Sequence, residues 1–332
     1  MIHHGGQLSL LRQRYPGAPE PLIDLSTGIN PFPYPVPPIP ETAYTRLPET
    51  EDIGKLKAAA AAAYGACDPD LIAVAPGTQI LISSLPRIFP AERVVIRSPT
   101  YGEFAAAWSA AGAAVVESAG IESLEEGDVA ILCNPNNPDG SGLAPTKLQE
   151  LQARRARAGG RLVVDEAFAE FSEANLSVVP ALPRPGLIVL RSFGKAYGLA
   201  GLRLGFLVAE PDIVIRVEEA LGPWPVSGIA IHAALAALGD EGWRGRMKER
   251  LARTGERLDS LLSSQGLEAV GGTSLFRLVR HDKAPWIAEA LGRAGILVRD
   301  FPERPGCLRF GMPPDEAAWR RLEAALTTAL AS

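Results

Sequence analysis

Four short segments of this sequence combine residues that can do chemistry, and each follows a run of apolar residues. Residues 75–79 (Ala-Pro-Gly-Thr-Gln) place a hydroxyl beside the backbone N–H groups of a helix start, where phosphate binds readily. Residues 134–140 (Asn-Pro-Asn-Asn-Pro-Asp-Gly) offer neutral amide donors, and Asp165 offers a carboxylate. Residues 191–195 (Arg-Ser-Phe-Gly-Lys) offer an amine, followed by Arg203. Each segment alone is typical of a cap, a loop or a solvated side chain, but together they predict one binding site.

The apolar runs that must position these segments alternate with stretches of helical composition. The runs rich in β-branched and other apolar residues lie at 73–75, 94–96, 113–117, 129–133, 161–164, 188–190 and 204–208. Strands that alternate with helices predict an α/β fold with a mostly parallel sheet and helices on both faces. Ligands bind beyond the carboxyl ends of such strands, so we expect the four segments at one edge of the sheet.

The pattern of expected helices and strands changes near residue 240. A charged helix is expected at 242–265, then strands at 274–279, 296–299 and 307–310, with helices at 284–294 and from 315. We therefore expect a small α+β C-terminal domain at residues 240–332, after a large domain at residues 46–239. Residues 1–45 are expected to form an N-terminal arm that contributes to the small domain and the active site. Within the arm, six of the residues 31–40 are proline, which indicates extended chain.

Composition limits the partners that this chain can have. The net charge of −5 and the absence of a basic block disfavour a nucleic-acid or membrane-surface partner. The three cysteines are widely spaced, which predicts neither a disulfide framework nor a metal site. Residues 221–239 approach the length of a membrane span, but Pro223 and Pro225 favour a turn before a buried helix. We expect a cytoplasmic protein with a small-molecule substrate.

Pyridoxal 5′-phosphate (PLP) is a ligand that needs every group in the four segments. Its aldehyde forms a Schiff base with a lysine, and a carboxylate keeps its ring nitrogen protonated. The chain resembles the fold-type-I PLP-dependent enzymes of the aspartate-aminotransferase superfamily, through residues 134–140, 165–168 (Asp-Glu-Ala-Phe) and 192–205 (Ser-Phe-Gly-Lys-Ala-Tyr-Gly-Leu-Ala-Gly-Leu-Arg-Leu-Gly). This resemblance covers nearly the whole chain, and it implies a seven-stranded sheet and a homodimer. No GxGxxG follows the first strand, which disfavours a nicotinamide enzyme.

The resemblance also implies a role for individual residues. Lys195 would form the Schiff base, Asp165 would pair with the ring nitrogen, and Asn137 would donate to the ring 3′-oxygen. Tyr101 would stack on the face of the ring. The cofactor phosphate would be held by Gly77, Thr78, Gln79, Ser192 and Arg203. Arg309 matches the arginine that binds the substrate carboxylate, for which the forked guanidinium suits better than an ammonium.

Two positions depart from the pattern of the superfamily. Phe168 stands where many aminotransferases have a tyrosine whose hydroxyl also contacts the 3′-oxygen, so we expect that hydrogen bond to be missing. Leu47 stands where relatives often place a tyrosine that reaches the cofactor phosphate of the neighbouring subunit. This departure puts that cross-subunit contact in doubt.

Two branches of the superfamily compete, the histidinol-phosphate aminotransferases and the threonine-phosphate decarboxylases of cobalamin biosynthesis. Residues 4–6 (His-Gly-Gly), 26–31 (Ser-Thr-Gly-Ile-Asn-Pro) and 223–227 (Pro-Trp-Pro-Val-Ser), together with Phe168, resemble the decarboxylases. The resemblance therefore predicts decarboxylation of L-threonine O-3-phosphate to (R)-1-amino-2-propanol O-2-phosphate. Transamination of histidinol phosphate, or another class I or II aminotransferase reaction, is the alternative. The residues themselves leave both open, because the outcome depends on which Cα bond stands perpendicular to the ring.

A phosphorylated amino-acid substrate carries two anionic groups, and the site must bind both. The imidazole of His4, the amides of residues 5–6 and Arg299 can bind the phosphate, while Arg309 binds the carboxylate. The residues expected to contact the substrate are His4, Gly5, Gly6, Ile29, Asn30, Asn137, Arg299 and Arg309. A cofactor-sensing DNA-binding regulator is disfavoured, because the sequence has no helix-turn-helix segment or basic patch.

Overall fold

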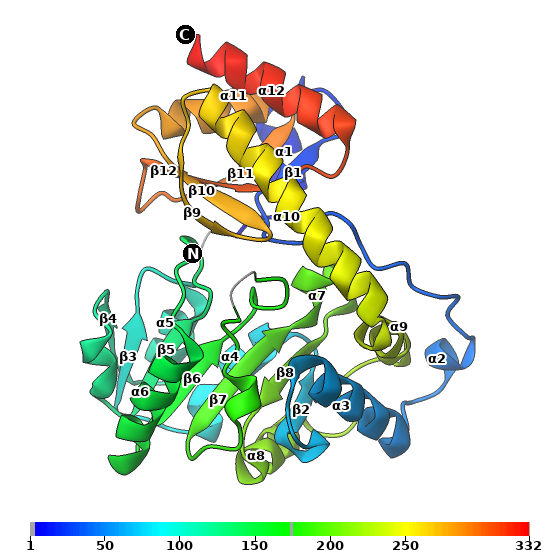
Figure 1. The fold of residues 1–332 in the computed structure, drawn as a ribbon, viewed down its shortest axis with the longest axis vertical. Helices are drawn as coiled ribbons and strands as arrows, with labels where there is room; N and C mark the ends of the chain where they lie inside the picture. The colour runs from blue at the N-terminus through cyan, green and yellow to red at the C-terminus, as the bar shows by residue number, and fades with distance from the viewer. Residues whose placement is uncertain (1–3, 173–174, 332) are drawn as a thin grey trace. The chain divides into compact units, whose positions relative to one another are not determined.

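The computed structural model describes residues 4–172 and 175–331, which form two compact units (Figure 1). The small unit comprises Met1–Phe32, Pro138–Gly140 and Arg246–Ser332, and the large unit comprises Pro33–Asn137 and Ser141–Gly245. These units follow contacts in space. The domain boundaries proposed from the sequence, at residues 1–45, 46–239 and 240–332, stay a prediction.

The large unit is built on a seven-stranded sheet, as predicted. In spatial order its strands are β2 (Ile72–Ala75), β8 (Gly205–Val208), β7 (Leu187–Ser192), β6 (Arg161–Asp165), β5 (Val129–Cys133), β3 (Arg93–Arg97) and β4 (Ala114–Ser118). Strand β8 pairs antiparallel with both β2 and β7, whereas the remaining pairs are parallel. Six of the strands therefore run in one direction, and the carboxyl ends of β6 and β7 lie side by side.

Helices cover both faces of this sheet. The helices of the large unit are α2 (Thr42–Thr45), α3 (Thr50–Tyr64), α4 (Thr78–Ile88), α5 (Glu103–Ala110), α6 (Pro145–Arg157), α7 (Phe193–Ala196), α8 (Pro211–Leu221) and α9 (Gly228–Gly239), with short 3₁₀ turns at η1 (Pro69–Leu71), η2 (Glu122–Glu125), η3 (Val179–Ala181) and η4 (Ala200–Leu202). Apolar residues of α4, α5 and α8 pack on one face, against alternate strand residues such as Ile131 and Val163. Successive strand residues point to opposite faces, so α6, which contacts β6 through its own buried leucines, covers the other.

The small unit contains a five-stranded sheet. Its spatial order is β1 (Ile23–Leu25), β11 (Ile296–Asp300), β12 (Cys307–Gly311), β10 (Phe276–Arg280) and β9 (Ala269–Thr273). The sheet packs with the helices α11 (Ala284–Arg293) and α12 (Glu316–Leu330), and with the second half of α10 (Glu241–Ser264). The same unit contains α1 (Leu8–Arg14). Strand β1 is parallel to β11, and the other pairs are antiparallel. The parallel strand comes from the N-terminal arm and buries Leu25 completely.

Strand β9 was not predicted from the sequence, because Gly271 and Gly272 indicated an interruption of regular secondary structure at this point. A Cβ at Gly271 would lie 2.1 Å from the carbonyl oxygen of Asp139, so the backbone of the 138–140 segment fits against this strand only because the glycines have no side chain. Among the described residues, no helix is both long and apolar enough to cross a membrane.

Candidate active site

The start of α4 in the large unit is suited to hold a phosphate. The helix begins at Thr78, directly after β2, and no side chain of the described residues caps it. Gly77, at the N-cap, has a φ of 87°, and a Cβ there would lie 2.8 Å from Nη2 of Arg203. A Cβ at Gly205 would lie 2.7 Å from the backbone nitrogen of Thr78. The two glycines therefore let the guanidinium and β8 approach the helix terminus, whose N–H groups favour an anion.

The predicted carboxylate and amine follow the neighbouring strands β6 and β7. Asp165 ends β6 and is 6% exposed; its Oδ1 accepts the N–H of Ala167 at 3.0 Å, and its Oδ2 accepts the thiol of Cys133 at 3.7 Å. Lys195 lies in α7, with Nζ 3.5 Å from Oγ of Ser192. Burial raises the pKa of Asp165, and the ammonium of Lys195 acts against that rise. A cationic ring nitrogen placed at this carboxylate would stabilise its ionised form further.

Phe168 contacts the lysine through its ring. The Nζ atom of Lys195 lies 5.1 Å from the centroid of this ring, within the range of a cation–π contact. The side chain at this position therefore offers an aromatic face, and has no hydroxyl to offer the cofactor. Leu47 lies between α2 and α3 and is 63% exposed.

Tyr101 and Gln79 form a short polar chain beside the start of α4. The hydroxyl of Tyr101 donates to Oε1 of Gln79 at 3.0 Å, and Nε2 of Gln79 donates to Glu103 at 3.1 Å. Burial raises the pKa of Tyr101 to about 12, so the phenol stays neutral at physiological pH. These contacts fix the position of the aromatic ring and orient the amide of Gln79.

The loop that carries Asn137 is held by the two asparagines before it. Asn134 donates to the carbonyls of Leu143 and Leu176 at 3.1 and 3.0 Å, and its own oxygen accepts the N–H of Leu143 at 2.7 Å. The side-chain nitrogen of Asn136 donates to the carbonyl of Pro99 at 2.9 Å. The first two amides of the motif are therefore structural. They position Asn137, which is half-buried.

This donor set fits PLP. A helix terminus with the hydroxyls of Thr78 and Ser192 and the guanidinium of Arg203 suits a phosphate, and the buried carboxylate of Asp165 suits a protonated ring nitrogen. The amine of Lys195 suits the aldehyde. All of the cofactor residues predicted from the sequence belong to the large unit, where they lie at or just beyond strand ends.

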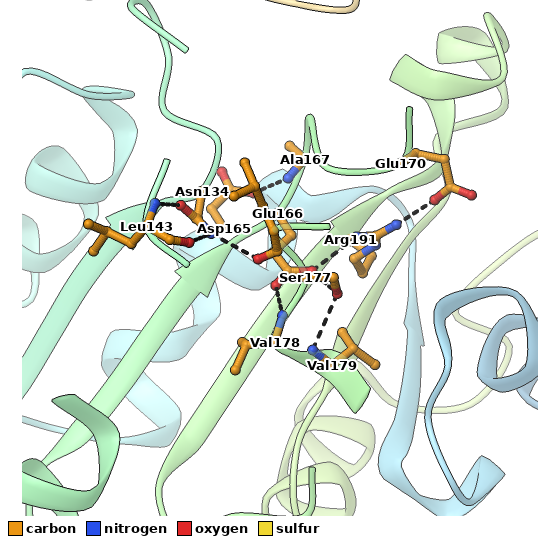
Figure 2. A network of polar contacts seen from close by, with 11 residues as sticks. Asn134, Leu143, Asp165, Glu166, Ala167, Glu170, Ser177, Val178, Val179 and Arg191 are labelled. Atoms are coloured by element: carbon orange, nitrogen blue, oxygen red, sulfur yellow. Dashed lines mark hydrogen bonds and ion pairs between the residues drawn. The ribbon is translucent and has the colours of Figure 1, made fainter. Parts of the chain in front are cut away.

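A buried cluster of charges lies next to Asp165, where β6 and β7 end (Figure 2). We call Glu166, Glu170 and Arg191 the Arg191 cluster. Nη1 of Arg191 donates to Glu166 at 3.0 Å and Nη2 donates to Glu170 at 2.5 Å, while the hydroxyl of Tyr197 donates to Glu170 at 3.1 Å. Glu166 also accepts the hydroxyl of Ser177 and a backbone N–H, both at 2.7 Å.

The Arg191 cluster ties together the residues that flank the proposed catalytic groups. Glu166 follows Asp165, and Arg191 precedes Ser192. Because successive strand residues point to opposite faces, the cluster joins the two strand ends on the face opposite Asp165 and Ser192. Burial alone would lower the pKa of Arg191, but the carboxylates of Glu170 and Glu166 raise it. Sequence analysis missed this cluster. Its only signal was the presence of charged residues at the ends of otherwise apolar strands.

Replacing Arg191 with methionine is expected to destabilise the protein. The change leaves two buried carboxylates without their cation, which costs on the order of 3–5 kcal/mol of unfolding free energy. Urea unfolding measures this loss. The matched control is Lys55→Met, because Lys55 pairs with Glu51 on the surface at 2.7 Å and such pairs contribute at most about 1 kcal/mol. A loss no larger than that of the control would contradict the importance of the cluster.

Two arginines stand directly opposite each other in the sheet of the small unit. Arg299 of β11 pairs with Arg309 of β12 in the antiparallel register. Like charges in this arrangement destabilise a sheet unless an anion compensates them. Burial and the charge of Arg299 lower the pKa of Arg309 to about 10, so both guanidinium groups stay charged at neutral pH. The pair is therefore suited to bind anionic groups.

A cavity of about 460 Å³ in the small unit is lined in part by Arg299. Its lining includes Ser26 and three residues predicted from the sequence to contact the substrate, which are His4, Gly5 and Arg299. The charged residues Arg14, Glu289 and Asp300 also line it. Gly6, Ile29, Asn30 and Arg309 belong to the same unit but do not line this cavity, and Asn137 belongs to the large unit.

Asn30 has a local role that the sequence analysis did not anticipate. Its side-chain oxygen accepts the backbone N–H of Phe32 at 2.9 Å, which closes a turn at the end of the small unit's N-terminal stretch. The side chain is buried, with 2% exposed. Its predicted contact with the substrate stays a prediction.

Comparisons with known proteins agree with this architecture. Residues 22–326 match the family model described as aminotransferase class I and II. The chain is 44% identical to a threonine-phosphate decarboxylase of Pseudomonas aeruginosa and 45% identical to one of Sinorhizobium sp., in each case over 98% of this chain and 97% of the relative. A crystal structure of histidinol-phosphate aminotransferase from Sinorhizobium meliloti in complex with pyridoxal-5′-phosphate has a TM-score of 0.84 at 21% identity, and covers 99% of this chain and 95% of its own.

The fold is that of the fold-type-I PLP-dependent enzymes, as predicted. The chain belongs to the aminotransferase class I and II family. The two decarboxylase relatives match it across almost their whole length, which confirms the branch that the N-terminal motifs indicated.

Proposed function

We propose that this protein is a PLP-dependent carboxy-lyase that converts L-threonine O-3-phosphate to (R)-1-amino-2-propanol O-2-phosphate in cobalamin biosynthesis. Two relatives at 44% and 45% identity, both described as threonine-phosphate decarboxylases, support this function over nearly the full chain. In the reaction the Cα–carboxylate bond breaks, carbon dioxide leaves, and Cα takes up a proton to give the amine.

The structural observation that carries the proposal is the cross-strand pair of Arg299 and Arg309. A phosphate and a carboxylate on one small molecule would supply the two anionic groups that such a pair attracts, and guanidinium groups bind both in a bidentate manner. Arg299 lines the 460 Å³ cavity together with His4 and Gly5, which suits the phosphate. We assign the carboxylate to the more deeply buried Arg309.

The cofactor residues have separate tasks in this proposal. When bound, PLP supplies an aldehyde and a protonated ring that accepts the electron pair of a breaking Cα bond. Lys195 binds the aldehyde, Asp165 holds the proton at the ring nitrogen, and Asn137 donates to the 3′-oxygen. Tyr101 stacks on the ring. The phosphate is held by Gly77, Thr78, Gln79, Ser192 and Arg203.

A direct assay separates this function from transamination. We expect the PLP-loaded protein to release carbon dioxide and the phosphorylated amine in equal amounts from L-threonine O-3-phosphate. With histidinol phosphate and 2-oxoglutarate we expect no glutamate. The Lys195→Ala variant, assayed under the same conditions, gives the background. Glutamate formation without release of carbon dioxide would identify an aminotransferase instead.

We also propose that the enzyme is a cytoplasmic homodimer that binds neither nucleic acid nor membrane. The resemblance to the superfamily supports the dimer, and the net charge of −5 argues against a polyanionic partner. Leu47 stands where relatives often place a tyrosine and has no hydroxyl. We therefore propose no hydroxyl contact from this position to the cofactor phosphate of the partner subunit.

A further inference from the structure

Ser26 joins three parts of the small unit through separate atoms. It follows β1 and is 1% exposed. Its hydroxyl oxygen accepts the N–H of Gly6 at 2.7 Å, and the hydroxyl itself donates to Oδ1 of Asp24 at 2.6 Å. Its carbonyl oxygen accepts Nη2 of Arg309 at 2.8 Å. One buried residue therefore contacts both the N-terminal segment and the arginine proposed to bind the carboxylate.

The carboxylate of Asp24 fixes the direction of these hydrogen bonds. A serine hydroxyl has one proton, and a short bond to a carboxylate is the stronger place for it. The backbone N–H of Ser26 donates to the same oxygen of Asp24 at 2.8 Å, which holds the carboxylate in place. The lone pairs of the hydroxyl are thereby turned toward the N–H of Gly6.

The N-terminal segment, residues 4–6, is shaped to this serine. A Cβ at Gly5 would lie 2.6 Å from the carbonyl oxygen of Ser26 and 2.8 Å from its Oγ, so only glycine allows the contact. Gly6 has a φ of +85°, which favours glycine for a second reason. Together the two glycines set the direction in which the chain reaches His4.

The same serine lines the cavity that holds the predicted phosphate-binding residues. His4, Gly5, Ser26 and Arg299 all contribute to its wall. Arg299 stands opposite Arg309 in the sheet, and Arg309 donates to the carbonyl of Ser26. A displacement of Ser26 would therefore change the spacing between the N-terminal segment and the two arginines.

We propose that Asp24 and Ser26 are positioning residues that set His4 and Gly5 at the distance from Arg309 that a phosphorylated amino acid requires. This inference rests on the proposed function and extends it to the choice of substrate. The pair acts on the phosphate end through the N-terminal segment and on the carboxylate end through Arg309. It therefore favours substrates that carry both groups at the right separation.

Ser26→Ala tests this inference with a split between two kinetic constants. The variant loses the hydrogen bond to Gly6, and we expect KM for L-threonine O-3-phosphate to rise about 5- to 20-fold while kcat stays within about twofold. For L-threonine without phosphate, kcat/KM should change by less than about twofold, so the preference for the phosphorylated substrate falls. The matched control is Ser260→Ala, since the hydroxyl of Ser260 is exposed on α10 and donates only to the carbonyl of Glu256 at 2.9 Å.

Asp24→Asn and the double variant show whether the two residues act together. Asp24→Asn should raise KM in the same direction, because the amide no longer fixes the hydroxyl proton. The double variant should be no worse than the poorer single variant, since residues that act as one unit are not additive. Circular dichroism and urea unfolding, compared with wild type, show that each variant is folded. If Ser26→Ala does not fold, Asp24→Asn alone decides the matter by the same KM criterion.

The outcomes separate this inference from the proposed function. A wild-type protein that does not decarboxylate L-threonine O-3-phosphate would overturn the function itself. An active wild type with an unchanged KM in Ser26→Ala and Asp24→Asn would overturn only the positioning role. A fall in kcat with no change in KM, or equal losses on both substrates, would also overturn it, because that pattern indicates general loss of structure.

Discussion

The Lys195→Ala variant is expected to lose the visible absorption band of the lysine-bound cofactor and to decarboxylate at least about 10²–10⁴-fold more slowly than wild type. The lysine is the only group in the proposed mechanism that binds the aldehyde, and loss of a positioned amine that also moves protons costs this much in enzymes generally. In the structure Nζ lies 3.5 Å from Oγ of Ser192 and 5.1 Å from the centroid of the Phe168 ring. These contacts direct the amine to one place.

A surface lysine of the same unit provides the control for this experiment. Lys147 pairs with Glu150 at 3.0 Å on the exposed side of α6, so Lys147→Ala should keep both the colour and the activity. Borohydride reduction followed by peptide mass mapping should place the cofactor on the peptide that contains Lys195. If the band persists in Lys195→Ala, or the cofactor maps to another lysine, the assignment is wrong.

The cofactor side of the site could be predicted because its residues lie next to strongly patterned strands. Asp165 and Ser192 end β6 and β7, and the apolar runs before them place both at the same edge of a parallel sheet. The apolar runs locate the strands of this sheet to within two residues, and β5 matches the predicted run at 129–133. The strands on the cofactor side, and the residues that follow them, could therefore be predicted from local sequence.

The charged residues behind that edge could not be predicted in the same way. In the sequence Glu166, Glu170 and Arg191 look like ordinary surface charges, because their burial arises from the pairing of β6 with β7 and from the loop that folds under them. Ser26 was part of a motif, and Asp24 is its neighbour in the sequence, but its other two partners are Gly6 and Arg309, which only the folded chain brings to it. Contacts of long sequence separation leave no periodic signal.

The glycines of β9 show a second reason for a missed element. A Cβ at Gly140 would lie 1.8 Å from the carbonyl oxygen of Gly272, so these glycines serve a close approach of two backbones within the small unit. Composition alone indicates a break at Gly-Gly, since glycine is depleted in strands. The requirement for close approach overrides that propensity here.

The Arg309→Met variant should separate stability from catalysis. Burial and the opposing charge of Arg299 lower the pKa of Arg309 to about 10, which means that the folded state disfavours its charged form. Methionine removes that charge at similar length, and with it the cost of burying a cation beside a second one. We therefore expect the free energy of unfolding to stay within about 1 kcal/mol of wild type or to rise, while kcat/KM for L-threonine O-3-phosphate falls at least about tenfold.

Arg191→Met is the matched comparison, because it is the same substitution at an arginine that pairs with two carboxylates. Urea unfolding should show a large loss for Arg191→Met and little or none for Arg309→Met, although both side chains are buried. The physical difference is that two carboxylates pair directly with Arg191, whereas the charge of Arg309 is opposed by Arg299 across the sheet and only partly offset by Asp24. A loss of stability in Arg309→Met as large as in Arg191→Met, with catalysis unchanged, would assign Arg309 to the structure of the small unit rather than to the substrate carboxylate.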